Sequence, residues 1–219
     1  MNRTADPKAN SAFAEGEATA VTRRELDVSE LPSYAFGHRS LMWWGTFGLI
    51  AIEGTLFALA IGAYLYLRSQ SDDWPISAPP PDLLWGSINT LILVASMWPN
   101  HMAKRAAEAC DHGRTRRWVL ACLVFAFAFL VIRGFEFAAL HIRWDSNAYG
   151  SIVWTLLGLH TVHLLTDTYD TVVLEVLLYK GPMEGQRFVD VSENALYWYF
   201  VVIAWVPIYG VIYWGPRLL

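Results

Sequence analysis

The chain has 219 residues, of which 55% are apolar or aromatic and 16% are charged. Soluble domains average about 45–50% apolar and about 25% charged residues, so this composition favours a membrane protein. The formal net charge of −4 is too small to indicate a nucleic-acid partner. The two cysteines, Cys110 and Cys122, form no zinc or redox motif and are interpreted as packing residues.

The first 40 residues are polar and contain no apolar run of the kind found in a signal peptide. We expect residues 1–30 to be largely disordered and the whole segment 1–40 to lie in the cytoplasm. Residues 41–219 are then expected to form one membrane domain.

Five apolar segments of this domain are long enough to cross a membrane, because a bilayer core about 30 Å thick requires about 20 residues of helix. They cover about residues 41–67, 83–102, 118–140, 149–179 and 195–214. The fourth exceeds the minimum length, so we expect it to tilt or to project from the bilayer. The predicted fold class is all-α, an integral membrane bundle of five transmembrane helices.

The basic residues predict how this bundle is oriented. Of the 16 Lys and Arg residues, twelve lie in the N-terminal segment and in the connections after the second and fourth spans. Three lie on the opposite side, and Arg133 lies within the third span. Because cytoplasmic loops are enriched in Lys and Arg, the N-terminus is expected inside and the C-terminus outside.

A carboxylate near the middle of the first span is the first candidate for a functional residue. Glu53 lies twelve residues into this span, about 18 Å along the helix. A charge at this depth is unfavourable, so such residues usually face protein, water or a partner. We interpret Glu53, with Tyr64 on roughly the same face, as a protonatable or lipid-contacting site. The alternative is a neutral carboxylic acid that bonds to a neighbouring helix.

The third span carries Arg133 and Glu136, which are three residues apart and can pair on one helix face. We interpret them as a structural ion pair near the external end of the span.

The fourth span carries a polar stripe within an arc of about 80°. Its members are His160, His163, Asp167 and Asp170. Three interpretations remain open: a metal site, a proton relay, or polar contacts with another helix in which an Asp one turn below holds each His. No Glu-x-x-His pair of the di-iron kind occurs in the sequence.

Short motifs follow one another in a characteristic order on the five predicted spans. They are Ile52–Phe57 with Tyr64, Asn89-Thr90, Glu136-Phe137, Tyr149-Gly150-Ser151 with Gly158–His163, and Tyr197-Trp198 with Tyr213-Trp214-Gly215. Over about residues 41–216 this order resembles subunit III of haem-copper respiratory oxidases in its short five-helix form.

The sequence departs from the pattern of that family at four positions. Tyr199 stands where the family has His, Val202 where it has Asp, Thr161 where it has Gly, and Arg133 where it usually has Gln. These departures indicate a divergent branch. A quinol oxidase subunit, or a subunit III-like protein associated with nitric oxide reductase, would look similar.

The resemblance implies a non-catalytic subunit in the inner membrane of a bacterium. Such a subunit has no catalytic residue, haem, copper or other metal of its own, and it packs against subunits I and II, which hold the haem and copper. It supports proton uptake, prevents inactivation during turnover and binds phospholipid in an interhelical cleft. By position, Glu53 is the midplane carboxylate of the family, and His160 and His163 are its paired histidines. The alternative is a stand-alone metalloprotein that uses the polar stripe of the fourth span.

Overall fold

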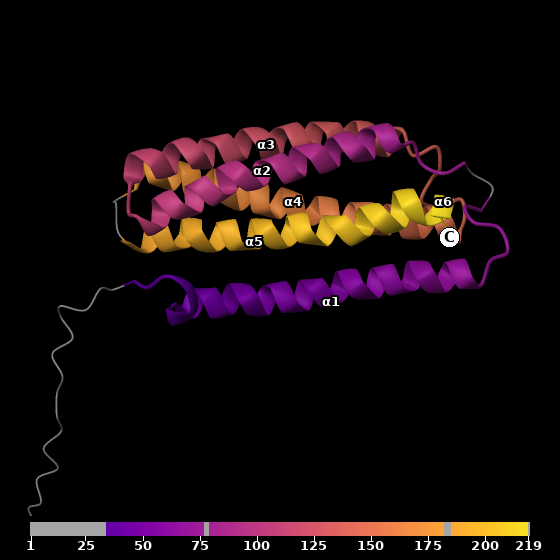
Figure 1. Ribbon diagram of the computed structural model, residues 1–219, viewed down its shortest axis with the longest axis horizontal. Helices are drawn as coiled ribbons and strands as arrows, with labels where there is room; N and C mark the ends of the chain where they lie inside the picture. Colours follow the sequence, from indigo (N-terminus) through magenta and orange to yellow (C-terminus); the bar gives the residue numbers. More distant parts are fainter. Residues whose placement is uncertain (1–33, 77–78, 182–184, 219) are drawn as a thin grey trace, which may run out of the picture. The chain divides into compact units, whose positions relative to one another are not determined.

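Five long helices make up most of the residues that the computed structural model describes, which are 34–76, 79–181 and 185–218. The segment 1–30, for which disorder is predicted, lies outside the described residues. Within the described ranges all regular structure is helical, as the sequence predicts. Figure 1 shows the long helices running alongside one another, with the chain reversing direction at each connection.

The helices follow in the order η1 (Gly37–Arg39), α1 (Leu41–Ser69), α2 (Leu83–Glu108), α3 (His112–Ala138), α4 (Ala148–Lys180), α5 (Gly185–Tyr209), η2 (Gly210–Trp214) and α6 (Gly215–Leu218). Four of the long helices begin at a side chain that accepts a hydrogen bond from a backbone N–H of the first turn. These N-cap residues are Ser40, Asp82, Asp111 and Asn147. Such caps stabilise a helix by about 1 kcal/mol each and fix where it starts.

Helix α4 packs against α1, α3 and α5, and α2 packs against α3 and α5. The apolar core between them includes Phe129 of α3, Leu157 of α4 and Trp205 of α5, each at most 1% exposed. Because α4 has neighbours on several sides, its polar residues can face different helices.

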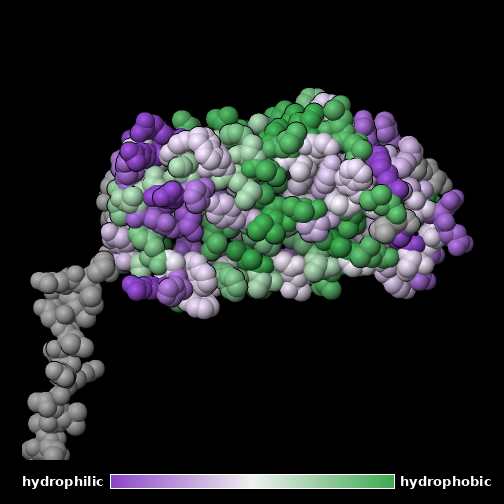
Figure 2. Space-filling view, viewed as in Figure 1, coloured by the Kyte–Doolittle hydropathy of each residue, from purple (hydrophilic) through white to green (hydrophobic). Residues whose placement is uncertain are grey.

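Within the described part of the chain, four stretches are long and apolar enough to cross a membrane: α1, α3, α4 and the continuous helical stretch Gly185–Leu218. Helix α2 has 26 residues but is not among these candidate spans, and it contains polar residues such as Asn89, Ser96 and Asn100. Figure 2 shows hydrophobic residues in a band between hydrophilic ends. The helical membrane-protein class is therefore confirmed with four candidate spans.

The last helix changes its winding near its end. Helix α5 passes into the π-helical turn η2 and then into α6 without leaving the helical path. A π-helical turn holds extra backbone per turn and often occurs at functional sites. Within η2, Tyr213 is 1% exposed and points into the bundle toward α2 and α3.

Candidate functional site

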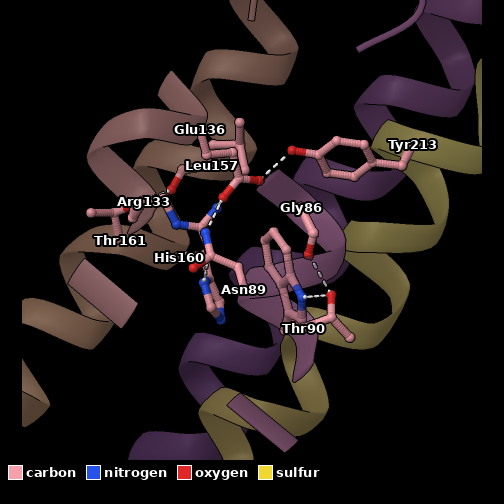
Figure 3. A network of polar contacts seen from close by, with 10 residues as sticks. Gly86, Asn89, Thr90, Arg133, Glu136, Leu157, His160, Thr161 and Tyr213 are labelled. Atoms are coloured by element: carbon pink, nitrogen blue, oxygen red, sulfur yellow. Dashed lines mark hydrogen bonds and ion pairs between the residues drawn. The ribbon is translucent and has the colours of Figure 1, made fainter. Parts of the chain in front are cut away.

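Two groups of polar side chains lie between the helices. The first, called here the Glu136 network, contains Asn89, Arg133, Glu136, His160 and Tyr213 (Figure 3). Nη1 of Arg133 lies 3.0 Å from Oε2 of Glu136, and each side chain is 1% exposed. The predicted pairing of these two residues on one face of α3 is therefore present, and the pair is fully buried.

Two neutral donors complete the surroundings of the Glu136 carboxylate. The side-chain amide of Asn89 on α2 donates to Oε2, and the hydroxyl of Tyr213 donates to Oε1. Gly86 makes room for Tyr213, since a Cβ atom there would lie 2.7 Å from Cε2 of the tyrosine ring. The carboxylate thus joins α2, α3 and the end of the α5 helical stretch.

Arg133 extends the network to α4. Its Nη2 lies 3.2 Å from Nδ1 of His160, whose Nε2 lies 3.1 Å from the carbonyl oxygen of Val201. A carbonyl only accepts, so Nε2 carries the hydrogen and Nδ1 accepts from Arg133. His160 is therefore neutral in this arrangement. The guanidinium also lies 4.3 Å from the ring centroid of Trp205, a favourable cation–π distance.

The second group surrounds Glu53 of α1. The hydroxyl of Tyr197 on α5 donates to Oε2 of Glu53 at 2.7 Å, and Nε2 of His163 on α4 lies 3.7 Å from Oε1. Nδ1 of His163 lies 2.6 Å from the carbonyl oxygen of Leu159, so this nitrogen carries a hydrogen. A neutral His163 would then present an acceptor to the carboxylate. A favourable contact requires one proton, held either by His163 or by Glu53.

Glu53 also lines a cavity of about 590 Å³ between α1, α4 and α5. We call it the Glu53 cavity. Among the described residues, its lining contains no Lys, Arg or His and five carboxylates: Glu53, Asp167, Asp170, Asp190 and Glu193. The Glu53 side chain is 19% exposed, compared with 1% for Glu136. This glutamate is therefore accessible to small molecules in a way that Glu136 is not.

The two carboxylates of α4 in this cavity share one amide donor, and Asp167 is only partly satisfied. The amide of Asn194 donates to Oδ1 of Asp167 at 3.2 Å and to Oδ2 of Asp170 at 3.3 Å. Asp167 is 3% exposed, and its Oδ2 has no hydrogen-bond partner among the described residues. The cavity thus joins Glu53 to a chain of further proton-accepting oxygens.

The polar stripe of α4 is divided between the two groups. His160 faces the Glu136 network, His163 faces Glu53, and Asp167 and Asp170 bond to Asn194. Pairing of each His with an Asp one turn below is not found within the described part of the chain. Nor do any three His, Cys, Asp or Glu side chains of that part lie close enough to hold a metal ion.

Tyr64 lies away from the Glu53 site. It is fully buried, and its hydroxyl accepts a hydrogen bond from Nε1 of Trp74 at 2.9 Å. Eleven residues of helix separate it from Glu53, about 16 Å along α1. Sequence reasoning instead missed Tyr197, Asn194, Asn89 and Tyr213 as site residues. Their polarity within apolar segments is the signal that marks them.

The structure shows what three of the residues that depart from the family pattern contact within this chain. The hydroxyl of Tyr199 lies 3.2 Å from Nδ1 of His101. Val202 is 3% exposed and belongs to the apolar core. The Thr161 hydroxyl donates to the carbonyl of Leu157 at 2.6 Å. These positions are accommodated within the bundle itself.

Comparison with known proteins agrees with the resemblance noted in the sequence. A family model described as cytochrome c oxidase subunit III matches residues 77–216. A cytochrome c oxidase subunit 3 of Synechocystis sp. is 24% identical over 203 residues, covering 89% of this chain and 86% of the relative. A probable cytochrome c oxidase subunit 3 of Mycobacterium bovis is 29% identical, covering 77% of this chain and 85% of the relative. A haem-copper oxidase subunit I+III of Aeropyrum pernix is 27% identical, covering 80% of this chain and 22% of the relative. The chain belongs to the cytochrome c oxidase subunit III family.

Proposed function

We propose that this chain is the non-catalytic subunit III of a haem-copper terminal oxidase in the inner membrane of a bacterium. Subunits I and II hold the haem and copper, and this chain stabilises subunit I and supports its proton uptake. The match of the family model over residues 77–216 carries the proposal. The Aeropyrum pernix relative supports a close association with subunit I, because its name combines subunits I and III in one protein.

The proposed topology includes α2 as a fifth span, within a membrane domain of residues 41–219. At 1.5 Å per residue its 26 residues extend about 39 Å, more than the bilayer core requires. Mean hydropathy counts every residue of a helix, whereas lipid contacts only its outer face. The polar residues Asn89, Ser96 and Asn100 are at most 4% exposed. The outer face instead presents large apolar side chains: Leu84, Leu91, Val94 and Trp98.

Five spans place the two termini on opposite sides of the membrane, with the N-terminus in the cytoplasm because the basic connections lie there. Epitope tags at the two ends test this arrangement in intact spheroplasts. A protease added outside is expected to remove the C-terminal tag and to spare the N-terminal tag. Removal of both tags, or of neither, would show an even number of crossings.

Within this subunit we assign proton exchange to Glu53. The carboxylate lies beside His163 and Tyr197, the contact with His163 requires one proton, and the cavity leads from it toward other carboxylates. The described lining of the cavity contains no Lys or Arg that pairs with Glu53. The Glu53→Ala variant is therefore expected to lose oxidase activity faster during turnover, with unchanged haem content. Bound phospholipid near this site is part of the same proposal.

Isolation of the intact complex tests the subunit assignment. The tagged chain is extracted from its native membrane in mild detergent, and co-purifying proteins are identified by mass spectrometry. Haem-copper oxidase subunits I and II are expected in equal amounts with the chain. Recovery of the chain without any haem-copper protein would reject the assignment, and recovery with a nitric oxide reductase would replace the terminal oxidase by that enzyme.

A further inference from the structure

A second cavity, of about 760 Å³, lies between the end of α2 and the start of α3. We call it the arginine groove. Its lining includes Arg105 of α2 and Ala109, which directly follows that helix, together with Arg114, Arg117 and Ala121 of α3. Spacings of three and four residues place these side chains on the facing sides of the two helices. The alanines leave the space between the helices open, and the arginines surround that space.

We infer that the arginine groove binds the phosphate headgroup of an anionic phospholipid. All three arginines are exposed. One carboxylate, Asp111, lies in the groove and pairs with Arg114 at 3.3 Å. A net positive charge therefore remains in the groove. Guanidinium groups bind phosphate oxygens with paired N–H donors, and basic pockets between membrane helices bind acidic lipid headgroups.

The surface beside the groove indicates a lipid rather than a soluble anion. Trp118 forms part of the groove, and its ring packs edge-on against Trp98 at 4.9 Å. From there, an apolar stripe of α2 continues toward the middle of the helix. Trp98, Val94 and Leu91 are 64%, 51% and 70% exposed. A lipid whose phosphate lies between the arginines would thus have an apolar track for its acyl chains. Trp98 and Trp118 lie at the groove, and tryptophan is enriched at membrane interfaces.

The groove is separate from the Glu53 cavity, since the two share no lining residue and are lined by opposite charges. The inference therefore does not depend on the role of Glu53. It also assigns no part of the oxidase reaction to the groove.

Native mass spectrometry of the purified complex tests the inference. The complex is exchanged into phosphatidylcholine and titrated with phosphatidylglycerol, and the lipid adducts give a Kd. Each basic residue near an anionic surface contributes about 1 kcal/mol, so the double variant Arg105→Gln/Arg117→Gln is expected to bind phosphatidylglycerol about thirtyfold more weakly. The double variant with Lys at both positions should retain most of the affinity, because the charges remain.

Arg187→Gln is the matched control. Arg187 lies in the first turn of α5, at the same end of the bundle but outside the groove, and pairs with Asp190 at 3.8 Å. It is expected to leave the Kd unchanged. Millimolar inorganic phosphate should not displace the lipid, since the apolar track contributes to binding. Equal affinity of the double Gln variant and the parent would overturn the inference. Displacement of the lipid by inorganic phosphate would also overturn the inference. The same holds if the double Gln variant loses a protein subunit while its lipid binding is unchanged.

Discussion

The Glu136 network and the Glu53 cavity use the same three kinds of side chain in different surroundings. Each contains a glutamate, a histidine from α4 and a tyrosine from the α5 helical stretch. Glu136 meets Arg133 at 3.0 Å, and both side chains are closed off from solvent. Glu53 meets His163 at 3.7 Å, is 19% exposed, and has further carboxylates as its cavity neighbours.

This difference separates a structural role from a chemical one. The Glu136 carboxylate is buried and pairs with the Arg133 guanidinium, so the contact itself ties α2, α3 and the last helix together. Glu53 lies 3.7 Å from His163 and lines a cavity, and under the proposed function this is where the subunit exchanges a proton. We propose that the two glutamates differ in role because Arg133 pairs with Glu136, whereas the described lining of the Glu53 cavity contains no Lys or Arg.

Loss of the charge on Glu136 is expected to have the largest effect on stability. Glu136→Gln leaves the buried guanidinium of Arg133 without its counter-charge, which typically costs about 3–5 kcal/mol. Thermal melts of the purified complex, monitored by dissociation of this chain, should show a marked fall in midpoint temperature. Arg133→Gln should be milder than Arg133→Ala, because a glutamine amide can still donate to Glu136. A Glu136→Gln complex as stable as the parent would remove the structural role.

Gly86→Ala tests whether the close approach of Tyr213 to α2 holds the network together. The added methyl group would overlap the tyrosine ring, and overpacking of this kind costs about 1–3 kcal/mol. Gly134→Ala on α3 is the matched control, since a Cβ atom there meets nothing within 4 Å. The midpoint temperature should fall for Gly86→Ala and should stay the same or rise for Gly134→Ala. Equal behaviour of the two variants would contradict this packing.

Tyr197→Phe removes one hydrogen bond to Glu53 while keeping the ring. Because the Glu53 cavity is accessible, water can replace the lost hydroxyl, and the expected loss is about 0.5–1.5 kcal/mol. Tyr213→Phe should cost more in the same melt, since Glu136 is closed off from water. A larger loss of stability for Tyr197→Phe than for Tyr213→Phe would contradict the difference in accessibility between Glu53 and Glu136.

Glu53→Gln is expected to have the smallest effect on stability, below about 1 kcal/mol. A glutamine oxygen can still accept from Tyr197, and its amide can donate to Nε2 of His163. The melting midpoint should therefore stay close to that of the parent. A loss comparable to that of Glu136→Gln would make Glu53 a structural residue.

Much of the helical framework follows from local sequence. Apolar runs predict the long helices, the spacing of three residues predicts the pair of Arg133 with Glu136, and depth along α1 marks Glu53. These features depend on one helix at a time. They can therefore be inferred without knowing how the helices pack.

The partners of the α4 stripe depend on that packing. An arc of about 80° on α4 borders more than one neighbouring helix, so His160 and His163, only three residues apart, reach different partners. The position of Tyr213 could not be predicted from the sequence either. The π-helical turn that contains Tyr213 changes the helical register, and the tyrosine hydroxyl thereby reaches Glu136. Periodicity assumes a regular helix and cannot foresee such a change.

The most direct measurement is the number of turnovers that the oxidase completes before inactivation when Glu53 is replaced by Gln. Complexes are matched for haem content and for the amount of this chain, and Gly134→Ala serves as the unaffected control. Because Gln can still accept the hydrogen bond from Tyr197 but cannot exchange a proton, we expect full assembly and markedly fewer turnovers. An unchanged turnover number in a fully assembled complex would show that proton exchange at Glu53 has no part in the function of this subunit.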